Sequence, residues 1–459
     1  MIPKISVVTR AYNAEKYIRE CIESVLGQSF TEFEYFIIEN GSIDGTRRIV
    51  EEYAVRDERI KAIYLEKNDV NVSAVKLLAE RGSGEYFMSL DSDDWLEKEC
   101  MKELYNGVKE TGADIAVGGT CFRDGNKKEL GMRKSDNAYF IARESIADAF
   151  RLLHQFFRPV WGKLFSAALV KENLERINEK RPSYLMYGGD TYTSLEFLKK
   201  ANGVYLSNKV LHNYRIHPSS VSYKYYGERF QSDVFLFRHA KELLQEFGEV
   251  SKENESFLFA VYFNAIQDTL NVLLASKENN LEKLEQLAVI FGEQTTKELF
   301  SLYGNEKICR LLKDIFHLIC EIAGSYQDRE EFEKCLLAIA NVSGLFDNCG
   351  LSGKFVMNYR NIMLLALENK WTEMKEKVIE LLAEKKISLP EEEVMLNILL
   401  RLSALTEDTN VFLLANKLLV RNLVKQEKNE EAKEVLSEIE EMVPTDPDIE
   451  ILKDEIKTQ

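Results

Sequence analysis

The chain has 459 residues, of which 45% are apolar and 30% are charged, so it can build packed cores and is not a disordered protein. Acidic residues outnumber basic residues by 76 to 60, which gives a net charge of −16. Because a nucleic-acid backbone requires a basic binding face, this balance excludes nucleic acid as a partner.

The sequence carries no clear signal for export or for crossing a membrane. Its longest apolar run, 257–263, has seven residues, against the ~20 that cross a bilayer. The N-terminus lacks the charged and apolar regions of a signal peptide. Seven scattered cysteines without a C-x-x-C pair fit reduced thiols. We therefore expect no transmembrane segment, and a cytoplasmic protein that is either free or peripheral to the inner face of the membrane.

The first half of the chain alternates strand-like and helix-like segments. Runs of β-branched and aromatic residues predict strands, and apolar residues at helical spacing predict helices. The expected strands are 5–9, 33–38, 60–65 and 85–90, and the expected helices are 15–26 and 46–53. This alternation predicts a parallel α/β sheet, which binds ligands beyond the carboxyl ends of its strands. A site is therefore expected among the segments 9–13, 39–42 and 91–95.

The second half predicts helices alone, since no proline occurs between Pro218 and Pro390. Near the end of the chain, three apolar residues and a proline follow the spacing of a tetratricopeptide repeat: Ala432, Leu436, Ile439 and Pro444. This places one repeat at 413–446, and the alternative is a helical bundle without repeats. We expect two domains, 1–231 and 232–459, the second all-α and tetratricopeptide-like towards its C-terminal end.

Three carboxylates follow the strand expected at 85–90, in the sequence Asp91-Ser92-Asp93-Asp94. At a strand end they repel one another and raise each other's pKa unless a cation binds. Mg²⁺ takes carboxylate and phosphate oxygens as ligands, so this segment predicts a divalent metal site for a phosphorylated ligand. The alternative is that Asp94 or a neighbour only caps a helix that begins near residues 95–98.

Residues 3–230 resemble the family 2 glycosyltransferases, whose nucleotide-binding α/β domain is called GT-A. The resemblance rests on motifs in the family's order and spacing at 5–13, 24–30, 41–46, 84–86, 91–95, 160–165, 188–190 and 214–218. It implies a GT-A domain at 1–231 that transfers a sugar with inversion. The implied donor is a nucleotide-diphosphate sugar, with uridine as the expected base. The implied acceptor is a hydroxyl of a glycan or of a cell-surface polymer precursor, for a hexosyl- or N-acetylhexosaminyl-transferase.

The resemblance also implies roles for individual residues of this sequence. Mn²⁺ or Mg²⁺ would be held by Asp93, Asp91 and His217, and Asp190 would take the proton of the acceptor hydroxyl. The nucleotide sugar would contact Thr9, Tyr12, Glu39, Asn40, Lys76, Asp91 and Ser92. Trp161 would line the acceptor side. The alternatives are a helix N-cap for Asp190, a structural role for His217 and a place in the core for Trp161.

Three positions depart from the family's pattern. Asn40 replaces an aspartate that accepts a hydrogen bond from the base, and its amide adds donors without charge. Val75 replaces an arginine, and the adjacent Lys76 is not equivalent to a planar guanidinium. Gly189 replaces the glutamate of a Gly-Glu-Asp triplet. Because the metal and base positions remain, we expect an active enzyme, the alternative being a non-catalytic scaffold that binds partners through its helical half.

The helical half carries no catalytic motif that we recognise. Stacked helix pairs present extended binding surfaces, so we expect this half to orient an acceptor, form a homodimer or bind a protein partner. The apolar run 257–263 should be buried, because polar helical neighbours such as Asn264 and Asp268 would be costly in lipid.

Overall fold

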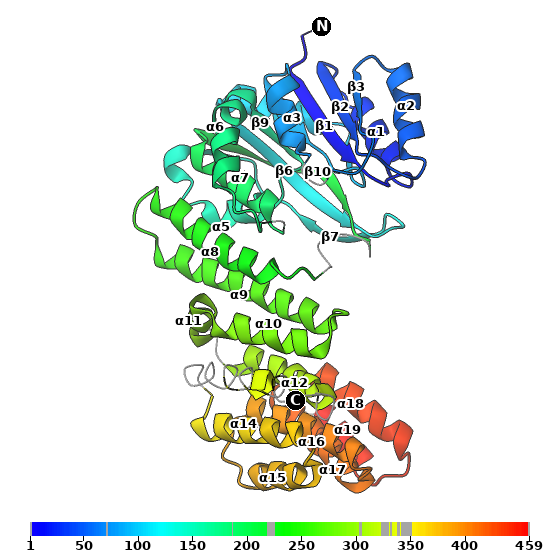
Figure 1. Ribbon diagram of the computed structural model, residues 1–459, viewed down its shortest axis with the longest axis vertical. Helices are drawn as coiled ribbons and strands as arrows, with labels where there is room; N and C mark the ends of the chain where they lie inside the picture. The colour runs from blue at the N-terminus through cyan, green and yellow to red at the C-terminus, as the bar shows by residue number, and fades with distance from the viewer. Residues whose placement is uncertain are drawn as a thin grey trace. The chain divides into compact units, whose positions relative to one another are not determined.

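The chain folds into an α/β domain followed by an all-helical domain (Figure 1). The computed structural model describes residues 2–69, 72–185, 187–217, 225–302, 305–322, 330, 333–336, 340 and 351–457. The two compact units are Met1–Val261 and Tyr262–Gln459. The first unit extends beyond the boundary expected at residues 231/232, because that boundary falls inside helix α8 (Arg229–Gln245), which packs on α7 (Gly189–Lys200).

Four parallel strands form the N-terminal part of a 10-stranded sheet, in the order β3-β2-β1-β4. They are β1 (Ile5–Ala11), β2 (Phe33–Glu39), β3 (Ile60–Tyr64) and β4 (Tyr86–Ser89). β1 pairs with β2 on one side and with β4 on the other, so that Ile5 lies opposite both Phe33 and Tyr86. The chain runs outwards from β1 and returns to β4. The carboxyl ends of β1 and β4 therefore meet at a topological switch point, where such sheets bind ligands.

The rest of the sheet is mixed, so the expected parallel pairing holds only for the first four strands. It consists of β5 (Trp95–Leu96), β6 (Ile115–Arg123), β7 (Glu129–Arg133), β8 (Tyr139–Ala142), β9 (Lys163–Ser166) and β10 (Gly203–Arg215). β9 is antiparallel to both β4 and β6, whereas β10 is parallel to β6. The hairpin of β6 and β7 is antiparallel because its connection is too short for a crossover.

Helices cover the sheet where apolar faces were expected. They are α1 (Ile18–Leu26), α2 (Thr46–Arg56), α3 (Ala74–Arg81), α4 (Cys100–Thr111), α5 (Phe150–Leu153) and α6 (Ala167–Lys180), besides α7 and α8. In α1, Ile18, Ile22 and Val25 share one face and are buried in the core of the domain. The helix expected to begin near residues 95–98 begins later, at Cys100, because Trp95 pairs with Asn213 of β10 as part of β5.

The first unit also contains the start of helix α9 (Lys252–Ala275). Asn254 of α9 donates its Nδ2 hydrogen to the carbonyl oxygen of Ala147 at 2.8 Å, and Phe257 lies edge-on to Phe150 with ring centroids 6.2 Å apart. No residue of the apolar run 257–263 is exposed. Leu258, Tyr262 and Phe263 are buried and the other four residues are half-buried, so the expectation that the run is buried is met only in part.

Helix α9 is also the one helix in the described part of the chain that is long and apolar enough to cross a membrane. The qualifying segment is Lys252–Leu274, with a mean hydropathy of 1.3. The core helix of a soluble protein meets the same criteria, and Leu258 and Phe263 of this helix are buried against protein.

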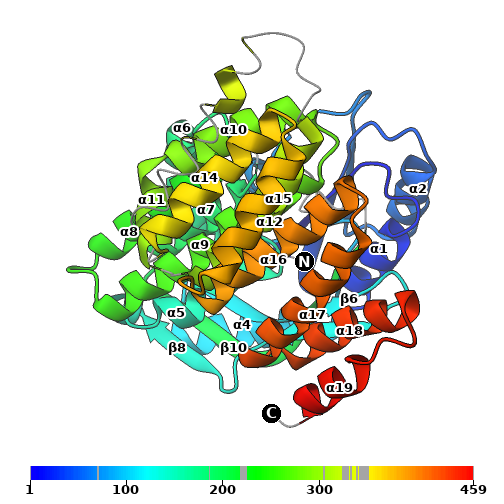
Figure 2. The same cartoon turned by 90° about the horizontal axis from the view of Figure 1, so that it is seen from below.

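The described part of the second unit consists of helices. They are α10 (Asn280–Gly292), α11 (Gln294–Leu302), α12 (Asn305–Ile322), α14 (Gly353–Leu367), α15 (Trp371–Ala383), α16 (Leu389–Leu405), α17 (Thr409–Lys425), α18 (Asn429–Met442) and α19 (Ile449–Lys457). Successive helices from α14 to α19 pack on one another (Figure 2). The repeat expected at 413–446 falls on α17 and α18, where Ala432 and Ile439 are buried. Its assignment as a tetratricopeptide repeat stays a prediction.

Candidate active site

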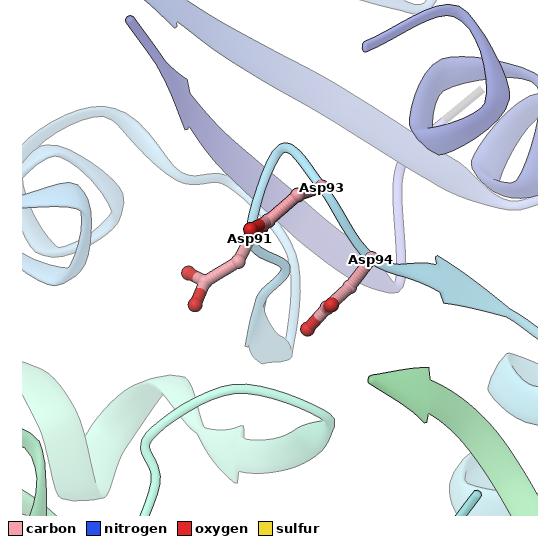
Figure 3. A group of neighbouring side chains, drawn as sticks. All are labelled: Asp91, Asp93 and Asp94. Carbon is pink, nitrogen blue, oxygen red and sulfur yellow. The ribbon is translucent and has the colours of Figure 1, made fainter. Parts of the chain in front are cut away.

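The loop between β4 and β5 places three aspartates at the switch point. One carboxylate oxygen each of Asp91, Asp93 and Asp94 lies within 4.8 Å of the others. Figure 3 shows the three side chains leaving this loop on the same side. Asp91 is exposed, Asp93 is half-buried and Asp94 is buried. The sequence identified Asp91 and Asp93 as candidate ligands, and the fold brings Asp94 beside them.

The three carboxylates repel one another. Although solvent reaches Asp91, desolvation by the surrounding protein raises its pKa well above the usual range, and the charges of Asp94 and Asp93 raise it further. The pKa of Asp94 is raised in the same way by burial and by Asp93. This is the repulsion expected from the sequence. A cluster of hard anionic oxygens suits Mg²⁺ or Mn²⁺, so the donor set fits the expected metal.

Asp94 faces the interior of the domain and does not cap a helix. Its Oδ1 accepts the backbone N–H of Arg215 at 2.9 Å, and its Oδ2 lies 3.2 Å from His212 Nε2. Burial lowers the pKa of His212 to about 3, so this imidazole is neutral. Trp161 stacks on His212 with ring centroids 4.2 Å apart and is only 9% exposed. Trp161 is therefore largely buried against His212, and its place on the acceptor side stays a prediction.

Arg215 holds the backbone of the loop between β4 and β5, called the aspartate loop below. Its Nε donates to the carbonyl oxygen of Asp93 at 2.9 Å, and its Nη2 donates to Glu20 Oε2 at 2.6 Å. The guanidinium lies between the rings of Tyr17 and Trp95, 4.7 and 4.6 Å from their centroids. Arg215 is therefore committed to holding this loop and not to a ligand. Glu20 carried no signal in the sequence, because only the fold brings it to Arg215.

His217 lies just beyond the end of β10 and reaches the same loop. Its Nε2 is 2.8 Å from Asp93 Oδ2, and its ring centroid is 5.5 Å from that of Tyr17. Asp93 and His217 thus meet from distant parts of the sequence, as the resemblance implied. The role of His217 as a metal ligand stays a prediction. Pro218, the next residue of that motif, lies outside the described residues.

Asp190 lies in the first turn of α7, so it is not the N-cap residue. The helix is preceded by Gly188, whose φ of 77° lies in the left-handed region that favours glycine. Solvent reaches the Asp190 side chain, yet burial among surrounding groups raises its pKa. The charge of Asp190 also raises the pKa of Asp91. The candidate base and the aspartate loop are therefore electrostatic neighbours.

The side chains expected to bind the nucleotide sugar divide into buried and accessible groups. Thr9 is buried, and its hydroxyl accepts from Tyr35 Oη at 2.9 Å. Glu39 is buried as well, and its Oε1 accepts the N–H of Ser42 at 2.7 Å. These two side chains support the strand ends. The exposed or half-buried members of the set are Tyr12, Lys76, Asp91 and Ser92.

Asn40 is occupied by a neighbouring loop of its own chain. Its Nδ2 donates to Asn68 Oδ1 at 2.8 Å and to the carbonyl of Asp69 at 3.1 Å, while its Oδ1 accepts the N–H of Asp69 at 3.1 Å. The adjacent Gly41 has a φ of 70°, and a Cβ there would lie 2.3 Å from the backbone of Lys67. An amide can pair with both backbone groups of Asp69, which a carboxylate cannot do. This accounts for asparagine at this position.

The comparisons with known proteins agree with the motifs. A family model described as Glycosyl transferase family 2 matches residues 6–174. EpsH of Bacillus subtilis, which carries a provisional glycosyltransferase name, is 27% identical over 332 residues, covering 70% of this chain and 94% of its own. That coverage necessarily takes the similarity beyond residue 230.

Two further proteins extend the comparison. Residues 1–349 of S. aureus TarS, solved in complex with UDP-GlcNAc, are 21% identical, with a TM-score of 0.41 and coverage of 78% of this chain and 92% of that one. TuaG of Bacillus subtilis, provisionally named a teichuronic acid biosynthesis glycosyltransferase, is 30% identical over 222 residues, covering 48% of this chain and 82% of its own. The chain belongs to glycosyl transferase family 2.

Proposed function

We propose that the protein is an inverting, metal-dependent glycosyltransferase that uses a nucleotide-diphosphate sugar, with uridine as the base. Family membership supports sugar transfer. The observation that carries the proposal is the group Asp91, Asp93 and Asp94, whose ligand oxygens lie within 4.8 Å at the switch point, with Asp190 nearby. The acceptor is a hydroxyl of a glycan or cell-surface polymer precursor, a class supported by the name of TuaG.

The aspartate loop would serve the leaving group. Asp93, Asp91 and His217 would hold Mn²⁺ or Mg²⁺, which when bound offsets the negative charge that develops on the departing diphosphate. Arg215 contributes by fixing the Asp93 carbonyl, so that the carboxylates keep their positions despite their mutual repulsion. Outer supports of this kind orient metal ligands and tune the affinity for the metal.

Asp190 would serve the acceptor. As the acceptor oxygen forms its bond to the anomeric carbon and the bond to the diphosphate breaks, Asp190 takes the hydroxyl proton. A general base works best when its pKa lies near the working pH, and burial raises the pKa of Asp190 in that direction. The first turn of a helix also favours the carboxylate that must accept the proton.

The proposal extends to location and partners. A cytoplasmic or membrane-peripheral location is supported by the free thiols of the described cysteines, Cys21, Cys100, Cys121, Cys309, Cys320 and Cys335, while Cys349 lies outside the described residues. The helical unit is proposed to bind a second copy or a protein partner. Light scattering of the full-length chain after size-exclusion chromatography separates these two outcomes.

The proposed function is tested by ligand-induced stabilisation of the purified protein. Nucleotide diphosphates and their sugars are screened by thermal shift with Mn²⁺, with Mg²⁺ and with EDTA, since a specific ligand raises the melting temperature by mass action. We expect UDP and a UDP-sugar to stabilise the protein only with metal. If no nucleotide sugar stabilises it with either metal, the proposal is wrong.

A further inference from the structure

An arginine lies where the family's glutamate side chain would begin. A Cβ built on Gly189 would lie 2.1 Å from Arg181 Nη2 and 2.6 Å from its Cζ. Arg181 follows the last residue of α6 and Gly189 is the first residue of α7, so the connection between these helices brings the guanidinium over Gly189. The residue after Gly189 is the candidate base Asp190. Where a carboxylate is usual beside the base, this chain has a guanidinium.

The Arg181 guanidinium is half-buried and only partly paired. Its Nη2 donates to the carbonyl oxygen of Leu185 at 2.6 Å. No other hydrogen bond or ion pair of this side chain occurs in the described part of the chain. A guanidinium presents several N–H donors in a planar fork, so Nε and Nη1 remain available for a ligand.

Two further basic side chains act on Asp190. The charges of Arg181, Lys163 and Arg10 all lower the pKa of Asp190, against the larger effect of burial. Lys163 is almost fully buried, and its Nζ donates to the carbonyl oxygen of Pro159 at 2.7 Å. The chain as a whole has a net charge of −16. Burial lowers the pKa of Lys163 well below its usual range, so the cations that attract an anionic ligand to this place are Arg181 and Arg10.

We propose that Arg181, left uncovered by Gly189, binds an oxyanion of the acceptor, a phosphate or carboxylate carried close to the hydroxyl that Asp190 deprotonates. The inference rests on the proposed function, in which Asp190 is the base on the acceptor side. A guanidinium fork matches phosphate and carboxylate oxygens in a bidentate manner. A neutral acceptor would leave these donors desolvated and unpaired, which is costly. The acceptor class is therefore anionic.

The test uses ligand-detected NMR on the full-length protein saturated with UDP and Mg²⁺. The anionic probes are glycerol 3-phosphate and glucuronate, with glycerol and glucose as their neutral counterparts. Saturation with UDP keeps the probes out of the donor's diphosphate site. We expect at least one anion to bind, and its affinity to fall about tenfold or more in Arg181→Gln. Arg176→Gln removes the same charge from an exposed position of α6 and should change nothing.

A second variant separates ligand binding from a structural role of Arg181. Gly189→Glu keeps Arg181, restores the family's triplet and places a carboxylate against the guanidinium, whose flexible end can shift to accommodate it. Both Arg181→Gln and Gly189→Glu should bind the anionic probe more weakly than wild type. The probe that binds wild type shows whether the acceptor's oxyanion is a phosphate or a carboxylate. Equal anion affinity in wild type and both variants, or no anion binding to wild type that binds UDP, would overturn the inference alone. Failure of UDP to bind with Mg²⁺ would overturn the proposed function and this inference with it.

Discussion

The loops that follow β2 and β4 lie at the same edge of the sheet. The side chain of Asn40 in the first loop is hydrogen-bonded, whereas the carboxylates of the second loop repel one another. After β2, the amide of Asn40 is hydrogen-bonded to Asn68 and to both backbone groups of Asp69. After β4, the carboxylates of Asp91 and Asp94 have raised pKa values and repel their neighbours. A buried polar group whose hydrogen bonds are satisfied stabilises the fold. A cluster of carboxylates that repel one another lowers the stability of the folded protein until a cation binds.

The β4 loop keeps its shape because its backbone is held even though its charges repel. Arg215 binds the Asp93 carbonyl, and the Arg215 backbone N–H binds the Asp94 carboxylate. Rigid support of repelling ligands is the arrangement expected of a preformed cation site.

Asp93→Asn should remove the repulsion and the metal site together. We expect transfer to fall below detection, and the metal-free protein to melt at a higher temperature, because the charge of Asp93 raises the pKa values of Asp91 and Asp94. Transfer assays and calorimetry in EDTA measure the two effects. The exposed Asp136→Asn is the matched control. Transfer by Asp93→Asn that persists in EDTA would remove Asp93 from the metal site.

Asp190→Asn tests the proposed general base. Loss of one general base should lower turnover by about 10²–10⁴-fold while leaving UDP affinity unchanged. Turnover assays and calorimetric titration with UDP measure these quantities, with the exposed Asp148→Asn as control. A collapse of UDP affinity would instead assign Asp190 to the donor or to the fold.

Arg215→Lys should loosen the β4 loop without removing a charge. Lysine cannot reach the Asp93 carbonyl and Glu20 with a planar fork, so metal affinity should fall about 10–100-fold. Turnover measured against Mg²⁺ concentration should recover at high metal, which a general loss of folding would not allow. Arg47→Lys, at an exposed ion pair in α2, is the control. Unchanged metal dependence of turnover would show that the hydrogen bonds of Arg215 do not affect the metal site.

Asn40→Asp should damage the β2 loop. The carboxylate would face the Asp69 carbonyl and Asn68 Oδ1 without donors, at a cost of about 1–3 kcal/mol in the free energy of unfolding. Denaturant titration measures this loss, and UDP and GDP titrations should show no gain in affinity. A tighter UDP complex at unchanged stability would mean that Asn40 faces the base, as the family's aspartate does.

The pH dependence of stability should differ with and without metal. Asp91 and Asp94 have folded pKa values above the usual 3.8, so the folded state binds more protons than the unfolded state. The metal-free protein should therefore gain stability as pH falls from neutral towards those raised values. Mg²⁺ should weaken this gain, because a bound cation favours the charged carboxylates. Melting temperatures across mildly acidic pH, in EDTA and in Mg²⁺, measure the difference.

The features that the sequence predicted are those that depend on local pattern. The first four strands, the aspartates after β4 and Asp190 at the start of a helix all follow from runs of adjacent residues. The residues that contact the site residues could not be predicted from the sequence. The contacts of Arg215 with Glu20 and of Arg181 with Gly189 form only when the chain folds. Trp95 was misplaced for the same reason, since its partner strand β10 comes over a hundred residues later.

On the nucleotide side, side chains that the resemblance assigns to the ligand are hydrogen-bonded within the chain, and their contact with the ligand stays a prediction. Asn40 stands at the base-reading position, yet its amide is used within the chain. Thr9 matches its motif as well, but its hydroxyl faces Tyr35 in the core. A motif locates a loop at the site, whereas packing decides which of its side chains reach a ligand.

The most direct test of the account is calorimetric titration of the wild-type protein with UDP, in Mg²⁺ or Mn²⁺ and again in EDTA. Asp91, Asp93 and Asp94 repel one another in the metal-free protein, and in our proposal they would hold a divalent cation that offsets the charge of the diphosphate. The proposal predicts tight UDP binding with metal and a marked loss of affinity in EDTA. Equal UDP affinity under both conditions would contradict it.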